Sequence, residues 1–224
     1  MPTSTEVYKL FLLKINRNDT NSDIDINRGE FVLLYNEQKD VWLKQQINAK
    51  ESNISSQDLN EVQVKHLSLT KLTDATDYSV FALPENFFSY ISSYTTASQG
   101  VCGGKIIRNY PIKPMNENML LENSNYEPSF EFEETIVDLS NNKLFVYKKD
   151  FEIEEVFFNY YREVGKIDLA GYRKLDGDMS TNIDPDISSI YINEILNRCA
   201  EEVIRRYENP EGFQLAQDRI NKEE

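Results

Sequence analysis

The sequence is poor in the side chains on which most catalytic and metal sites depend. Its 224 residues include one histidine, His66, and two cysteines, Cys102 and Cys199. A single imidazole excludes a histidine-based zinc site, and two cysteines without motif spacing indicate free thiols in a reducing cytoplasm. The chain also lacks a secretory signal pattern and any apolar run close to the roughly 20 residues that cross a bilayer, so we expect no membrane partner.

Positive charge is scarce as well. The chain has 24 Lys and Arg against 38 Asp and Glu, which gives a formal net charge of −14. Because binding to phosphate groups requires clustered basic side chains, we do not expect a general affinity for nucleic acid. Hydrophobic residues make up 40% of the chain and include 12 Phe and 13 Tyr. That content is enough to bury a core and excludes wholesale disorder.

The glycine-rich segment that begins at Gly100 is an incomplete phosphate-binding motif. A Walker loop needs a glycine where this chain has Gln99 and a serine or threonine where it has Ile106. We therefore interpret the segment as a turn between two β segments. No G-x-S-x-G elbow accompanies His66, which we interpret as structural or solvated. The sequence thus predicts no catalytic residues, no cofactor and no enzyme activity.

Two acidic loops resemble calcium-binding loops without completing the pattern. The loops that begin at Asp23 and Asp176 both break the EF-hand spacing at the sixth and twelfth positions. We predict no metal site, since acidic loops are usually solvated. An irregular oxygen site within residues 176–186 stays open as an alternative.

Helical periodicity marks three segments. Thr3 and Glu6 have capping-box spacing ahead of an apolar stripe, which predicts a first helix. A second amphipathic segment, residues 30–47, carries an aromatic stripe that includes Trp42. We expect these two helices to pack as an antiparallel pair. A last helix is predicted to begin near Asp186.

The segment between these helices has a period of two, which is typical of strands. Its clearest part predicts a three-stranded antiparallel meander with a tight turn at Asn141 and Asn142. In the first of these strands, Glu131 and Glu133 alternate with three apolar residues, which are Phe130, Phe132 and Ile136. The two glutamates are therefore predicted to lie on the outer face of that strand.

These patterns together predict an α+β fold, in which an N-terminal helical pair and a C-terminal helix pack with an antiparallel β-domain. We divide the chain into four parts: a helical segment 1–62, a β-rich region 63–162, a long loop and helix 163–208, and a polar tail 209–224. In the tail, Phe213 and Leu215 stand among charged residues. The tail is therefore either a frayed terminus or a docking arm that orders against a neighbouring subunit, and we favour the arm.

Several segments resemble structural proteins of crAss-like gut bacteriophages. The helix that ends Val41-Trp42-Leu43-Lys44-Gln45-Gln46 is similar to a tryptophan-containing helix of that family. The segment Pro128-Ser129-Phe130-Glu131-Phe132-Glu133-Glu134-Thr135 is similar to the family's Pro-Ser-Phe-acidic-aromatic-Glu-Glu-Thr strand. The segments 145–147, 160–162 and 193–204 follow in the family's order. The resemblance therefore spans roughly residues 7–204.

This resemblance implies a non-enzymatic virion protein made in the bacterial host cytoplasm. It implies a ring subunit of the portal-proximal head-to-tail connector or tail barrel, which forms a channel that DNA passes through without specific binding. The implied partners are further copies in a dodecameric ring, the portal protein, and other ring and tail proteins of the virion. We expect inter-subunit contacts at Trp42, Phe213 and Leu215, and an acidic lumen or surface at Glu131 and Glu133.

The residues also leave a second function open, a β-rich module that binds a ligand such as a carbohydrate. Two aromatic pairs, Phe157-Phe158 and Tyr160-Tyr161, would then supply a stacking platform, although we favour core or subunit-interface positions for them because few basic residues lie nearby. A binding module predicts a stable monomer with an exposed aromatic patch, whereas a ring subunit predicts a cyclic assembly.

Overall fold

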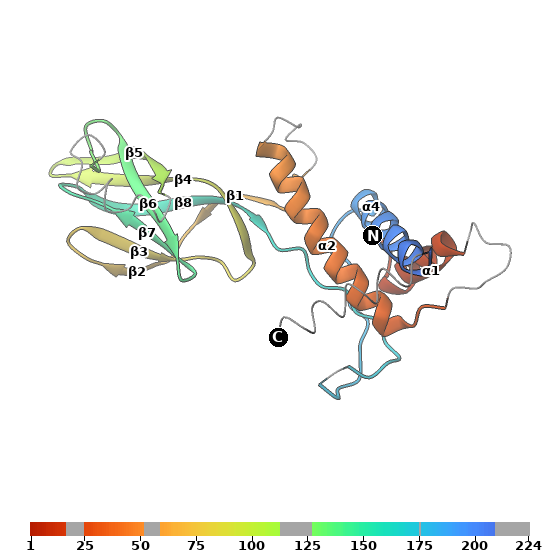
Figure 1. Ribbon diagram of the computed structural model, residues 1–224. Helices are drawn as coiled ribbons and strands as arrows, with labels where there is room; N and C mark the ends of the chain where they lie inside the picture. Colours follow the sequence, from red (N-terminus) through yellow and green to blue (C-terminus); the bar gives the residue numbers. More distant parts are fainter. Residues whose placement is uncertain (17–24, 52–58, 113–126, 175, 209–224) are drawn as a thin grey trace, which may run out of the picture. The chain divides into compact units, whose positions relative to one another are not determined.

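The computed structural model describes residues 1–16, 25–51, 59–112, 127–174 and 176–208 (Figure 1). The chain divides into two compact units, a helical unit of residues 1–61 and 164–224 and a β unit of residues 62–163. The described helices are α1 (Ser4–Ile15), α2 (Arg28–Glu51) and α4 (Ser189–Glu208). The described strands are β1 (Gln63–Ser68), β2 (Lys71–Asp74), β3 (Tyr78–Ala82), β4 (Phe87–Gln99), β5 (Cys102–Pro111), β6 (Glu134–Ser140), β7 (Lys143–Tyr147) and β8 (Glu152–Arg162). The predicted α+β class is confirmed.

The helical unit is held together by the buried stripes of its three described helices. α1 begins with the predicted capping box, in which the Thr3 hydroxyl accepts the Glu6 N–H and the Glu6 carboxylate accepts the Thr3 N–H. Two buried rings, Phe11 on α1 and Phe31 on α2, have centroids 4.8 Å apart. Both α1 and α2 pack against α4. The buried stripe of α4 consists of Ile192, Ile195, Leu196, Cys199, Ala200 and Val203.

α4 therefore changes the expected arrangement of the first two helices. We predicted that α1 and α2 would pair with each other; they touch through Phe11 and Phe31, but the backbone of each lies closer to α4 than to the other. The physical reason is that α4 presents a wide apolar stripe that can cover two neighbours at once. None of the helices in the described ranges combines the length and the apolar character that a membrane crossing needs.

The β unit is one curled sheet with the strand order β1-β8-β4-β5-β6-β7-β3-β2. Neighbours pair antiparallel except β5 and β6, which are parallel. β1 and β2 stand at opposite ends of this order although they are consecutive in the chain. The residues between them bridge the two ends, because Leu69 N–H donates to Val156 O of β8 and Ala82 N–H donates to Thr70 O. The sheet thus curls around a core to which most of its strands contribute.

The sequence correctly predicted one hairpin of this sheet but not the meander. β6 and β7 are joined at Asn141 and Asn142, whose φ angles of 51° and 58° fit a two-residue hairpin turn. However, β7 then pairs with β3, and β8 pairs with β1 and β4. The meander prediction was wrong because β8 finds a partner of similar length in β4, with which it forms a far longer ladder than β7 allows.

The hairpin turn gives a first testable prediction. Asn142 is exposed and held at positive φ, where glycine has no steric cost. Replacing Asn142 by glycine should raise the free energy of unfolding by about 0.5 kcal/mol, measured by urea denaturation. Asn142→Ala is the matched control and should lower it. A less stable N142G protein would contradict the assigned turn.

Candidate functional site

Trp42 lies inside the helical unit instead of facing a second subunit. Its side chain is fully buried. The indole Nε1 donates to Glu194 Oε2 at 2.8 Å, and its ring lies 5.2 Å from that of Tyr191. Both partners belong to α4, so the aromatic stripe of α2 is used within the subunit. The expected inter-subunit contact at Trp42 is therefore corrected to an internal one.

Two polar residues of α2, which the sequence analysis did not single out, hold the chain that follows the β unit. The buried Lys39 ammonium donates to Val164 O at 2.7 Å. The Asn36 amide exchanges two hydrogen bonds with the backbone of Ile167, at 3.0 and 3.1 Å. These contacts tie residues 164–167 to α2, and each satisfies a polar group that would be costly to bury alone. No sequence pattern marks them, because their partners are backbone atoms far away in the chain.

The loop before α4 is organised around one buried carboxylate, that of Asp168. Asp168 accepts hydrogen bonds from the Tyr172 hydroxyl at 2.8 Å and from the Leu169 N–H at 2.8 Å, and it pairs with Lys174 at 2.8 Å. Burial alone would raise the pKa of Asp168, but these donors outweigh burial and lower it. Burial and the neighbouring Asp168 carboxylate raise the pKa of Tyr172 to about 12. The cluster stabilises the loop and leaves Asp168 charged at neutral pH.

The acidic residues of the 176–186 loop do not converge on one point. Asp184 accepts the Ser4 N–H at 2.7 Å, and Asp186 accepts the Gly165 N–H at 3.0 Å. Asp176 accepts the N–H of Asp178 at 3.0 Å. Across the described ranges, no group of three or more His, Cys, Asp or Glu side chains is arranged to hold a metal ion.

These contacts support a prediction about metal dependence. Because Asp184 and Asp186 each cap a backbone N–H, calcium would have to compete with existing hydrogen bonds. Thermal melting curves in excess chelator and in excess calcium should coincide. An upward shift of the melting temperature with calcium, but not with magnesium at the same ionic strength, would contradict the prediction.

Glu131 and Glu133 lie in a turn and not on a strand. Ser129 and Glu134 exchange backbone hydrogen bonds at 2.8 and 3.1 Å, which closes the turn ahead of β6. Glu133 has a φ of 59°, and Phe132 is 76% exposed. The predicted strand at residues 130–136 was therefore wrong at its start, because a tight turn can also alternate apolar and polar residues. Both glutamates are exposed, as expected.

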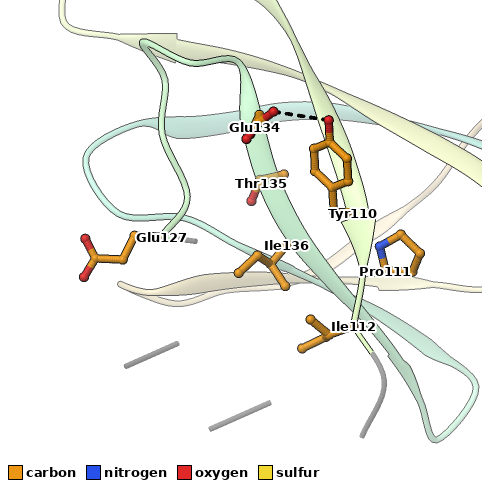
Figure 2. A pocket seen from close by; sticks show the side chains of 7 residues that line it. All are labelled: Tyr110, Pro111, Ile112, Glu127, Glu134, Thr135 and Ile136. Carbon is orange, nitrogen blue, oxygen red and sulfur yellow. Dashed lines mark hydrogen bonds between the residues drawn. The ribbon is translucent and has the colours of Figure 1, made fainter. Parts of the chain in front are cut away.

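A hollow of about 340 Å³ lies beside this turn, between the end of β5 and β6 (Figure 2). The Tyr110 hydroxyl donates to Glu134 Oε1 at 3.2 Å across its rim, and Glu127, at the other side, pairs with Lys149. The remaining lining residues are Pro111, Ile112, Thr135 and Ile136. This lining contains no histidine or cysteine. Its chemistry is that of a small acidic and apolar recess.

No protein-family model matches the sequence, and no curated protein is significantly similar to it. Two of the expected contact residues, Phe213 and Leu215, lie outside the described residues.

The aromatic residues of β8 divide between the two faces of the sheet. Phe158 and Tyr160 are buried in the core, whereas Phe157 is half-buried on the outer face. There it stacks on Tyr94 of β4, with ring centroids 4.9 Å apart and an interplanar angle of 18°. The four aromatics therefore do not form one platform, since alternation along a strand separates them.

His66 completes this outer cluster. Its ring Nδ1 lies 3.2 Å from the Tyr94 hydroxyl. The backbone N–H of His66 donates to Asn159 Oδ1 at 2.8 Å. The φ of His66 is 56°, at a point where the pairing of β1 with β8 shifts register. A bulge that holds a non-glycine residue at positive φ is uncommon. Sequence periodicity could not have found it, because one extra residue leaves no pattern.

Proposed function

We propose that the chain is a non-enzymatic ring subunit of the head-to-tail connector or tail barrel of a bacteriophage virion. Copies of the chain, in contact with the portal protein and other ring proteins, would surround the channel for DNA. The observation that carries this proposal is the order of resembling segments, from the Trp42 helix to the segment 193–204. Two of those segments contact each other within the helical unit, through Trp42 and Glu194.

The surface charge supports a channel that DNA can pass. The net charge is −14, and Glu131 and Glu133 are exposed on the turn before β6. Carboxylates repel the phosphate backbone, so a lumen lined with them lets the duplex slide without binding. The exposed Phe132 ring between these glutamates offers an apolar contact for a neighbouring subunit.

Oligomeric state tests the proposal directly. Mass photometry and negative-stain microscopy of the purified chain, alone and with the portal protein, should show a closed ring in at least one condition. In particles, the chain should be present at the copy number of a ring. A count of one to a few copies, or an abundance like that of a capsid protein, would contradict the ring.

Charge reversal at Glu131 and Glu133 tests the acidic lumen. Glu131→Lys combined with Glu133→Lys should create duplex-DNA binding that weakens steeply as salt rises. Asp178→Lys combined with Glu163→Lys changes the net charge equally at other exposed positions and is the matched control. Equal DNA binding by both double variants would contradict the proposal that Glu131 and Glu133 line the DNA channel.

One observation favours the alternative of a carbohydrate-binding module, namely the outer cluster of His66, Tyr94 and Phe157. Aromatic faces next to amide and hydroxyl groups suit the stacking and hydrogen bonding of a sugar ring. If this is the function, the chain should be a monomer that binds oligosaccharides, and Tyr94→Ala should abolish the binding. A closed ring without glycan affinity would exclude it.

A further inference from the structure

The helical unit has an apolar hollow that no described residue of the chain fills. It lies between α1 and α4, has a volume of about 450 Å³, and is lined by Leu10, Leu13, Lys14, Asn16 and Asn193. Leu10 is 41% exposed and Leu13 is 66% exposed. Lys14 Nζ donates to Asn197 Oδ1 at 2.6 Å, which joins α1 to α4 along the hollow. We refer to this feature as the α1–α4 hollow.

Ile190 extends the apolar surface along α4. It is 68% exposed and lies three residues before Asn193, which places both on one side of the helix. Single exposed aliphatic side chains are common and need no explanation. Two of them line the hollow and a third lies on the same side of α4 as Asn193, and such a group is typical of a surface that a partner covers.

The composition of the tail suits this surface. Residues 209–224 follow the last described residue of α4, and their apolar members Phe213, Leu215 and Ile220 are separated by polar and charged residues. Such a segment cannot form a core of its own, but its apolar side chains can occupy a hollow. Glu211, two residues before Phe213, carries a charge opposite to that of Lys14, which lines the hollow.

Chain length favours the tail of another copy over the tail of the same chain. Asn193 and Glu208 are 15 residues apart on α4, which is about 22 Å along the helix axis. Five residues lead from Glu208 to Phe213, and fully extended they reach at most about 17 Å. The backbone of Phe213 can therefore approach the level of Asn193 within its own chain only if these five residues are fully extended and double straight back. Phe213 of a second copy has no such limit.

We infer that residues 209–224 of one copy bind in the α1–α4 hollow of a neighbouring copy, with Phe213 at the end formed by Leu10 and Asn193. Exchange of this arm links copies head to tail, which is the contact that generates a closed ring when the rotation between copies closes. The inference fits the proposed ring but does not require it, because arm exchange would equally join an open chain of subunits.

Disulfide trapping between full-length chains tests the inference. One chain carries Leu10→Cys and the other Phe213→Cys, both with the exposed Cys102 replaced by serine; Cys199 is buried and is left in place. Mixed under mild oxidation, the two variants should give a two-chain band on a non-reducing gel at about tenfold the level of the control pair. The control pair uses Leu33→Cys, which is 65% exposed on α2 and does not line the hollow.

Each outcome of this experiment decides the inference. A two-chain band no stronger than that of the Leu33→Cys control would overturn it. The double variant with both cysteines in one chain separates the remaining cases. A product of single chains closed on themselves would show that the tail folds back, which also overturns the inference. A ladder of linked chains supports it, and whether that ladder ends in a closed ring decides the proposed function separately.

Deletion of residues 209–224 gives a second, independent readout. Because the tail belongs to another copy's hollow, its loss should leave the melting temperature of the isolated subunit almost unchanged while abolishing assembly. Normal assembly of the truncated chain would overturn the inference even if the disulfide forms.

Discussion

Replacing Trp42 by alanine should lower the free energy of unfolding by about 3–5 kcal/mol, the cost typical of removing a large buried aromatic side chain. The indole is fully buried between α2 and α4, and its Nε1 hydrogen bond to Glu194 is lost with it. Urea denaturation followed by far-UV circular dichroism measures the effect. Fluorescence is unsuitable because Trp42 is the only tryptophan.

Two further variants separate the causes of this loss. Trp42→Phe keeps most of the ring volume but cannot donate to Glu194, so it should cost less than the alanine variant. Val41→Ala changes a partly exposed residue on the same helix and should cost no more than about 0.5 kcal/mol. If the free energies of unfolding of the Trp42→Ala and Val41→Ala variants were equal, the burial of Trp42 between α2 and α4 would be contradicted.

Acid should weaken the β unit through Asp74. Its carboxylate accepts hydrogen bonds from the Lys148 ammonium at 2.8 Å and from the Ser79 hydroxyl at 2.7 Å. These contacts, that of Lys148 first, hold the pKa of Asp74 well below its ordinary value. A carboxyl whose pKa is lower in the folded state stabilises that state above its unfolded pKa of about 4, and the stabilisation is lost as pH falls toward the folded value.

The expected result is a pH-dependent difference between the native chain and Asp74→Asn. At pH 7 the variant should be less stable by about 1–2 kcal/mol, a modest value because the Asp74 carboxylate is partly exposed and screened by solvent. The difference should narrow as pH falls below about 4. Urea denaturation at a series of pH values measures it.

Glu152 provides the matched control for this pair. Its carboxylate accepts from the same Lys148 ammonium at 2.6 Å but is much more exposed than Asp74. Burial tends to lower the pKa of Lys148, but the hydrogen bonds to Asp74 and Glu152 outweigh burial and raise it. Glu152→Gln should therefore cost less than Asp74→Asn. A constant difference between native and Asp74→Asn proteins from pH 7 to pH 2 would contradict the assigned role of Asp74.

The features that could be predicted from sequence are those set by neighbouring residues. The capping box of Thr3 and Glu6 and the turn at Asn141 and Asn142 each depend on a few consecutive backbone groups, and both are present. Periodicity also predicted the three described helices and most of the strand positions. It did not predict which strands pair, because alternation fixes the faces of a strand but not its neighbours.

The candidate site was harder to predict for the same reason. An aromatic stripe such as that of Trp42 indicates burial, yet the sequence cannot say whether the covering surface is α4 or a second subunit. Glu131 and Glu133 were correctly expected to be exposed, although they lie in a turn closed by Ser129 and Glu134. The bulge at His66 depends on a long-range register shift and has no local signature.

The division of the chain into units has a consequence for the order of its synthesis. The β unit is one uninterrupted stretch, residues 62–163, whereas the helical unit consists of the two ends of the chain. On a ribosome that adds about 5–20 residues per second, α4 follows α2 by roughly 8–30 s. During that interval the β unit can fold, while Trp42 and the rest of the α2 stripe still lack the helix that covers them. The nascent chain therefore exposes the apolar faces of α1 and α2 during that interval, and a chaperone that shields residues 4–51 until translation ends would protect them from aggregation.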